Sequence, residues 1–144
     1  MNSYQDANAA VIDRWVAEGW EWGKPVDHQT YLKAQDGQWS VLLTPTKPVP
    51  SEWFGSLKGK KILGLASGGG QQMPVFSAAG AECTVLDYSE KQLESERTVA
   101  DREGYRINIV RADFTLTDIY EDTNGEGRLH ELHIPSFIAT RAVK

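Results

Sequence analysis

The chain has 144 residues, with 15 Lys and Arg against 20 Asp and Glu, a formal net charge of −5 and 40% hydrophobic residues. This corresponds to one domain, too apolar for a disordered chain and without an apolar run near the ~20 residues of a membrane helix. The acidic balance argues against a nucleic-acid partner, and the N-terminus lacks a secretory signal. We therefore expect a cytoplasmic protein that acts on small molecules, without a membrane or nucleic-acid partner.

The N-terminal part of the chain predicts a helix followed by a less regular cap. Apolar side chains recur at nearly helical spacing over residues 4–18, and Gly19 stands where that helix should end. Residues 45–50 include three prolines, which exclude a helix and favour an extended, stiff connector. We assign residues 1–58 to this cap and connector, and residues 59–144 to a more regular domain that forms one compact unit with the cap.

In the second part of the chain, short apolar runs alternate with helical patterns, which is typical of a parallel sheet with crossover helices. One helix should follow a loop over residues 67–72 and end at Gly80. The next should begin after Ser89, which forms a capping-box pattern with Gln92, and end at Gly104. Strands are expected at residues 62–66, 82–87 and 106–111. This alternation is one mononucleotide-binding half of a doubly wound α/β fold.

A glycine-rich turn and a carboxylate lie where such a unit binds a nucleoside. Gly68, Gly69 and Gly70 follow the first strand, and residues without Cβ let a ligand approach the backbone. Asp87 ends the second strand, 19 residues after Gly68, where a carboxylate accepts hydrogen bonds from ribose hydroxyls. A merely structural turn would also use glycines. The dinucleotide pattern requires a further glycine where this chain has Met73. An NAD-dependent oxidoreductase is therefore kept only as the runner-up.

Three segments resemble motifs of class I S-adenosylmethionine-dependent methyltransferases. Residues 62–70 resemble the first motif, a strand that ends in a Gly-x-Gly turn beside the amino-acid part of the cofactor. Residues 85–93 resemble the second motif and residues 111–114 the third. Residues 44–54 and 64–72 are similar to one bacterial subgroup of small-molecule-type enzymes, and this resemblance covers nearly the whole chain. The resemblance implies a Rossmann-like three-layer α/β sandwich and S-adenosylmethionine as cofactor.

The resemblance also implies which residues contact the cofactor. Residues 66–70 would line the methionine and ribose, Asp87 would bind the ribose hydroxyls, and Asp113 would face the adenine amino group. The residues that flank adenine would be Tyr88 and Gln92, with Phe114 adjacent to Asp113. The full set comprises Ala66, Ser67, Gly68, Gly69, Gly70, Asp87, Tyr88, Gln92, Asp113 and Phe114. One departure is Gly64, where most class I enzymes have an acidic residue that helps to hold the cofactor's ammonium group.

A segment of the family pattern is missing from the chain. Residues 114–122 and 134–142 resemble the last two strands of the family, a closing antiparallel pair, and they follow almost directly after the third strand. We infer an internal deletion with its junction at residues 113–115. The loops that hold the methyl acceptor belong to the missing region, so the acceptor is an unknown small molecule and no catalytic residue is assigned. The chain is then a methyltransferase or a shortened, catalytically inactive domain that binds the nucleoside.

The missing strands should leave the strand at residues 62–66 with an unpaired apolar edge. Such an edge is a template for association, so either the closing strand pair moves in beside this strand or another chain does. We therefore expect a homodimer, in which strands could be exchanged between the subunits.

Other conspicuous residues have simpler interpretations. Cys83 is the single cysteine, which excludes an internal disulfide, and it fits a small core residue. His130 and His133 are three residues apart beside a predicted strand and do not match the zinc-binding helix motif, so no metal site is expected. The cap tryptophans either line an acceptor pocket or belong to the core; they are Trp15, Trp20, Trp22 and Trp53.

Overall fold

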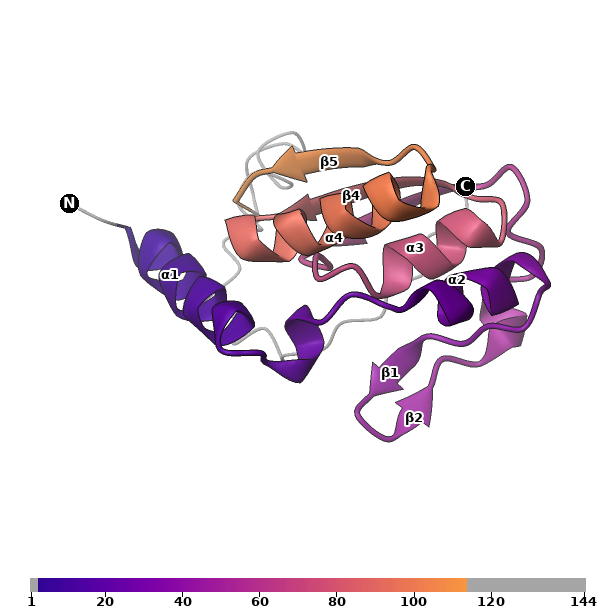
Figure 1. Cartoon of the computed structure of the whole chain (residues 1–144), viewed down its shortest axis with the longest axis horizontal. Helices are drawn as coiled ribbons and strands as arrows, with labels where there is room; N and C mark the ends of the chain where they lie inside the picture. Colours follow the sequence, from indigo (N-terminus) through magenta and orange to yellow (C-terminus); the bar gives the residue numbers. More distant parts are fainter. Residues whose placement is uncertain (1–2, 114–144) are drawn as a thin grey trace, which may run out of the picture. The chain divides into compact units, whose positions relative to one another are not determined.

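The computed structural model describes residues 3–113 of the chain, which fall in two compact units. One unit contains the residues up to Trp39 and those from Ser56 onward, and it carries the parallel sheet (Figure 1). Residues Ser40–Gly55 belong to the second unit. None of the described helices is both long enough and apolar enough to cross a membrane.

The predicted order of strand, helix, strand, helix and strand is confirmed. The parallel strands lie in the order β3-β4-β5, with Gly64 beside Val85 and Val85 beside Ile109. Their bounds are Lys61–Leu65 for β3, Glu82–Asp87 for β4 and Asn108–Arg111 for β5. The crossover helices are α3, Gln72–Ala78, and α4, Glu90–Glu103. The chain is therefore an α/β protein, as the sequence predicts.

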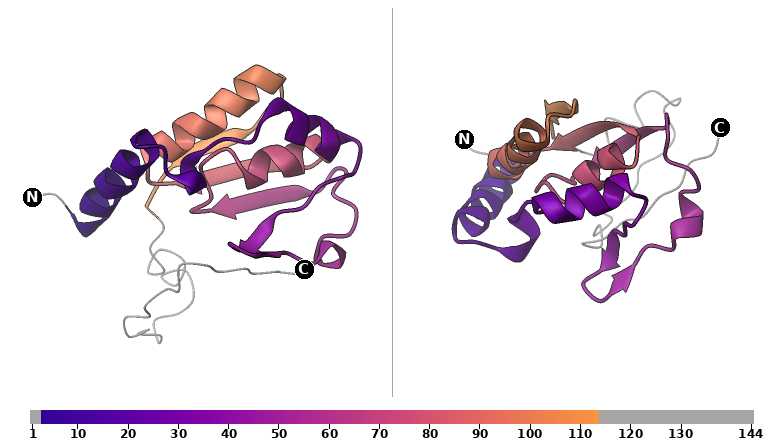
Figure 2. Two further views of the ribbon diagram at one scale, coloured as in Figure 1. Left: turned by 60° about the horizontal axis from the view of Figure 1, so that its bottom comes forward. Right: turned by 45° about the vertical axis from the view of Figure 1, so that its right-hand side comes forward.

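The helices α3 and α4 pack on one face of this sheet and touch each other, as Figures 1 and 2 show. This face holds the apolar core, in which Val85, Leu93 and Val99 are completely buried. Cys83 is buried here as well, and burial raises the pKa of its thiol, which agrees with the predicted core role. The three-layer sandwich expected of the whole family would need helices on the opposite face too, and that third layer stays a prediction.

Both ends of α4 are set by the residues that the sequence singles out. The hydroxyl of Ser89 accepts a hydrogen bond from the backbone N–H of Gln92 at 3.2 Å, while the Gln92 side chain does not return the bond. Only the first half of the predicted capping box is therefore formed. Gly104 ends the helix in the left-handed conformation, with φ of 71°.

The N-terminal residues form two helices and a short 3₁₀ turn. Helix α1, Tyr4–Ala17, matches the prediction and is followed by η1, Glu21–Gly23. A second helix, α2, His28–Gln35, was not expected, although Asp27 provides its N-cap by accepting from the N–H of Thr30. Helix α1 packs against α4, and α2 packs against α3.

The second unit corrects one prediction. The expected extended connector is a hairpin, in which β1, Leu42–Thr44, pairs antiparallel with β2, Lys47–Pro48. A 3₁₀ turn, η2, Ser51–Trp53, follows. The prolines do exclude a helix, but Pro45 favours the turn, and Pro48 is tolerated because its strand is very short. The predicted closing strands and the pair His130 and His133 lie outside the described residues.

Candidate functional site

The glycine turn and the carboxylate of Asp87 contact each other directly at the carboxyl end of the sheet. The backbone N–H of Gly68 donates to Oδ2 of Asp87 at 2.9 Å, and the N–H of Ser89 donates to Oδ1 at 2.9 Å. The N–H of Ala66, just after β3, donates to the carbonyl of Leu86 in β4 at 2.8 Å. The two halves of the predicted site therefore lie side by side, as the sequence spacing requires.

Three successive backbone amides of this turn are already engaged by the protein. Besides the bond from Gly68 to Asp87, the N–H of Gly69 donates to the carbonyl of Gln92 at 2.9 Å. The N–H of Gly70 donates to Oε1 of Glu96, also at 2.9 Å. Pyrophosphate-binding turns need such amides free to face the phosphates. Here two of the three face carboxylates instead, so the turn does not offer them to an anion.

Glu96 is a site residue that the sequence reasoning missed. Its side chain is completely buried, Oε1 accepts from Gly70, and Oε2 has no hydrogen-bond partner among the described residues. The pKa of Glu96 is raised to about 7, mainly by burial; the bond from Gly70 opposes this shift, and the charge of Asp87 adds to it. One signal could have found this residue, because Glu96 follows Leu93 and precedes Val99 and Ala100 on the apolar face of α4.

The glycines of the turn are required by its close approach to α4. A Cβ on Gly68 would meet the Cβ of Gln92 at 2.7 Å, and one on Gly70 would meet the carbonyl oxygen of Ser95 at 2.7 Å. Gly69 and Gly70 also have positive φ, at 102° and 67°. The space that a Cβ would occupy is therefore filled by other atoms of the protein. This packing holds the turn in position, and it leaves no space for a ligand on that side of the glycines.

Gly64 lies near the end of β3 and Ala66 directly follows this strand, and each differs from the residue that the motif would usually have. Ala66 has a φ of 47°, a backbone region that residues other than glycine rarely adopt. A Cβ on Gly64 would lie 2.1 Å from the hydroxyl of Ser67 and 2.9 Å from the sulfur of Met73. The hydroxyl of Ser67 therefore occupies the space that the family's acidic side chain would need, which explains why glycine stands at position 64.

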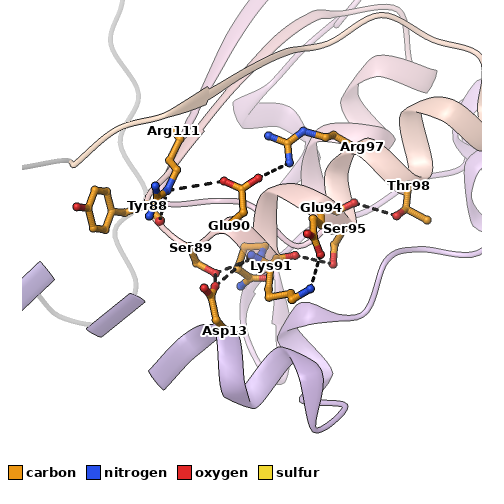
Figure 3. A network of polar contacts seen from close by, with 11 residues as sticks. Asp13, Tyr88, Ser89, Glu90, Lys91, Glu94, Ser95, Arg97, Thr98 and Arg111 are labelled. Carbon is orange, nitrogen blue, oxygen red and sulfur yellow. Dashed lines mark hydrogen bonds and ion pairs between the residues drawn. The ribbon is translucent and has the colours of Figure 1, made fainter. Parts of the chain in front are cut away.

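Helix α1 reaches the carboxyl end of the sheet through polar contacts that the sequence did not predict. The hydroxyl of Tyr88 donates to Asp6 at 2.8 Å, and the amide nitrogen of Gln5 donates to Asp113 at 2.8 Å. Asp13 accepts from the hydroxyl of Ser89 at 2.5 Å and from a backbone N–H at the start of α4 at 3.1 Å (Figure 3). Helix α1 is thereby fixed beside the predicted adenine-binding residues.

The charges around this edge are mostly negative. The hydrogen bond from Tyr88 is the main reason that the pKa of Asp6 is lowered, and the same bond raises the pKa of the phenol. Arg111 lies over the Tyr88 ring, 5.0 Å from its centroid, and its Nε donates to the Tyr88 carbonyl at 3.2 Å. Asp87 and Asp113 add further carboxylates at the ends of β4 and β5.

The structure brings most of the predicted cofactor residues to one edge of the sheet. Ala66 to Gly70, Asp87 and Tyr88 adjoin there, and Asp113 follows β5. Gln92 is buried under the turn, with its side-chain oxygen facing Gly69. Phe114 lies outside the described residues. No group of three or more potential metal ligands occurs in the part of the chain that the structure describes.

The cap tryptophans separate in the structure. The rings of Trp15 and Trp20 lie 5.5 Å apart at 58°, and with Glu18 and Gly19 they line a hollow of about 340 Å³. The backbone carbonyl of Trp22 instead lies close to Gly69. Trp15, Trp20 and Trp22 therefore do not line one common pocket.

The chain was compared with family models and with known proteins. No protein-family model matches it. Over 130 residues, 90% of its length, it is 42% identical to the "Uncharacterized methyltransferase YbaJ" of Bacillus subtilis (strain 168). The chain is a relative of a methyltransferase. This confirms the resemblance predicted from the motifs at the level of a methyltransferase. The chain spans about half the length of that relative, 51% of it.

Proposed function

We propose that the chain binds S-adenosylmethionine at the carboxyl end of β3 and β4 and is a shortened, cofactor-binding derivative of a class I methyltransferase. The observation that carries this proposal is the contact between the Gly68 amide and Asp87. That bond fixes the carboxylate beside the turn, and each carboxylate oxygen keeps a lone pair for a ribose hydroxyl. The methyltransferase relative independently supports the same reaction class.

The electrostatics of the site favour this cofactor over a dinucleotide. S-adenosylmethionine carries a positive sulfonium and no phosphate, whereas NAD carries a pyrophosphate that needs free backbone N–H groups. In this turn the N–H groups of Gly68 and Gly70 already face Asp87 and Glu96. The carboxylate of Asp87 would repel a pyrophosphate and attract a cation. The arrangement therefore supports an adenosyl sulfonium rather than NAD.

When bound, the cofactor would supply an activated methyl group, and the chain's own residues would bind and orient it. Asp87 would hold the ribose, and Tyr88 and Asp113 would contact adenine, the positions that the family resemblance implies. No residue is assigned as a base. Because the chain spans about half of its relative, we propose that it binds the cofactor with little or no turnover. The acceptor is proposed to be a small molecule.

Calorimetry with S-adenosylmethionine, S-adenosylhomocysteine and NAD tests the proposal. We expect the two adenosyl compounds to bind and NAD not to bind. The variant Asp87→Asn, which keeps one side-chain acceptor, should weaken binding about tenfold or more, because an ionised acceptor is replaced by a neutral one. Asp101→Asn, an exposed change on α4, is the matched control and should bind like the original chain.

Two outcomes would contradict the proposal. One is the absence of binding of both adenosyl compounds by protein that circular dichroism shows to be folded. The other is tighter binding of NAD, which would favour the oxidoreductase alternative. A methylation assay on the sample that binds the cofactor then separates an active enzyme from an inactive nucleoside-binding domain.

A further inference from the structure

The hollow at the C-terminal end of α1 is open to solvent and large enough for a small molecule. Its volume of about 340 Å³ lies within the range of small-molecule sites, roughly 300–1,000 Å³. Trp15 is 41% exposed, and a Cβ on Gly19 would meet no atom within 4 Å. The lining residues are Trp15, Glu18, Gly19 and Trp20, all in the unit that carries the parallel sheet. A ligand can therefore reach this lining directly.

The two indole rings form aromatic walls that a fixed turn holds in place. Their planes are inclined at 58° with the centroids 5.5 Å apart, so the rings diverge, whereas a parallel stack would cover one face of each. The backbone N–H of Trp20 donates to the carbonyl of Trp15 at 2.9 Å, and the N–H of Gly19 donates to the carbonyl of Val16 at 3.0 Å. The hollow thus presents aromatic surface on a supported backbone.

The hollow also carries negative charge that no cation of the described chain neutralises. Glu18 lines it, is exposed, and forms no ion pair within the residues that the structure describes. Arg14, the basic residue in the last turn of α1, is not among the lining residues. The C-terminal end of a helix adds partial negative charge of its own. These charges favour a positively charged occupant.

Aromatic walls and negative charge together select one class of ligand. The faces of tryptophan rings attract cations, and they do so best when the cation is weakly hydrated. A compact ammonium is strongly hydrated, whereas methyl groups on the nitrogen displace that water and pack against the rings. We propose that this hollow is a binding site for a small molecule with a methylated ammonium group. None of its lining residues belongs to the predicted cofactor site, so the inference does not rest on the proposed function.

NMR titration with choline chloride, without any cofactor, tests the proposal. The indole N–H signals of Trp15 and Trp20 should shift with a dissociation constant on the order of 1 mM, while that of Trp53 should not. Sodium chloride keeps the ionic strength constant during the titration. 3,3-Dimethylbutan-1-ol has the shape of choline with a neutral carbon in place of the nitrogen. It should bind at least about fivefold more weakly than choline.

Two variants assign the binding to the hollow. Glu18→Gln keeps the shape of an exposed side chain and should weaken choline binding about threefold or more, without weakening the binding of the neutral alcohol. Trp15→Leu removes one aromatic wall and should also weaken choline binding about threefold or more. Glu52→Gln and Trp53→Leu, at exposed positions of the second unit, are the matched controls and should bind choline like the original chain.

Three results would overturn the proposal. The first is a titration in which choline shifts neither indole signal. The second is equal affinity for choline and the neutral alcohol, a comparison that needs no variant. The third is an unchanged choline affinity in Glu18→Gln that circular dichroism shows to be folded. Binding of S-adenosylmethionine is measured separately, and its presence or absence leaves each of these results decisive.

Discussion

Glu96 accepts a hydrogen bond from the backbone N–H of Gly70 at 2.9 Å while its whole side chain is buried. The bond joins α4 to the last glycine of the turn. It also places a titratable group beneath the candidate cofactor site, with Asp87 near enough to raise its pKa. The charge of Glu96 adds to the effect of burial in raising the pKa of both Tyr105 and Cys83.

This burial predicts a pH dependence of stability. The pKa of Glu96 is raised from 4.5 to about 7, so the folded state binds more protons than the unfolded state between these values. The contribution of Glu96 to stability is therefore fully present below about pH 4.5 and is lost as the pH rises through about 7. The shift corresponds to roughly 3 kcal/mol. Urea unfolding of the original chain at a series of pH values should show this decline.

The variant Glu96→Gln isolates the effect. Its amide oxygen can still accept from Gly70, and it has no charge to bury, so the free energy of unfolding should change little between pH 5 and 8, in contrast to the original chain. Glu82→Gln, at an exposed position of β4, is the matched control and should keep the original slope. Equal slopes for Glu96→Gln and the original chain would refute the assignment.

Ala66 predicts a stabilising substitution. Its φ of 47° costs an L-residue about 1 kcal/mol relative to glycine. Ala66→Gly should therefore raise the free energy of unfolding by about 0.5–1 kcal/mol. Ala10→Gly, in the exposed part of α1, should lower it by about 1 kcal/mol because glycine disfavours an ordinary helix. If both changes destabilise the protein equally, the backbone at Ala66 is not strained.

Gly64 and Ser67 should be energetically coupled. The variant Gly64→Ala would place a methyl group 2.1 Å from the Ser67 hydroxyl and should cost about 1–3 kcal/mol. In the double variant with Ser67→Ala the hydroxyl is absent, so part of that cost should be recovered. A double-mutant cycle measured by urea unfolding checks this. A coupling energy of zero would show that the hydroxyl moves aside freely.

Local signals made the parallel sheet predictable. Strand β4 begins and ends where the sequence analysis expected it, because Gly80 and the Ser89 cap bound a single apolar run. Helix α2 was missed because it is short and mostly polar, with only Tyr31 and Ala34 buried. The hairpin in residues 42–48 was missed because three prolines fit an extended chain as well as a turn.

The site could be predicted only as far as its local motifs reach. The spacing of Gly68 and Asp87 was informative because a fixed unit, one helix between two parallel strands, separates them. The contacts of α1 could not be predicted, because the hydrogen bonds from Gln5 to Asp113 and from Tyr88 to Asp6 join segments that are distant in sequence and share no motif. Glu96 was missed because a charged residue on an apolar helix face contradicts the pattern that locates a core.

The edge of the sheet predicts the oligomeric state. Within the described residues β3 pairs only with β4, and Leu63 and Leu65 of this edge strand are 57% and 39% exposed. An apolar strand with a free edge favours pairing with a second chain, so we expect a homodimer in light scattering coupled to size-exclusion chromatography.

Leu63→Lys should shift the protein toward the monomer, because a charged residue on the edge opposes such pairing. Leu32→Lys, at an exposed leucine of α2, should leave the dimer intact. A monomeric original chain, or equal effects of the two lysines, would count against association through β3.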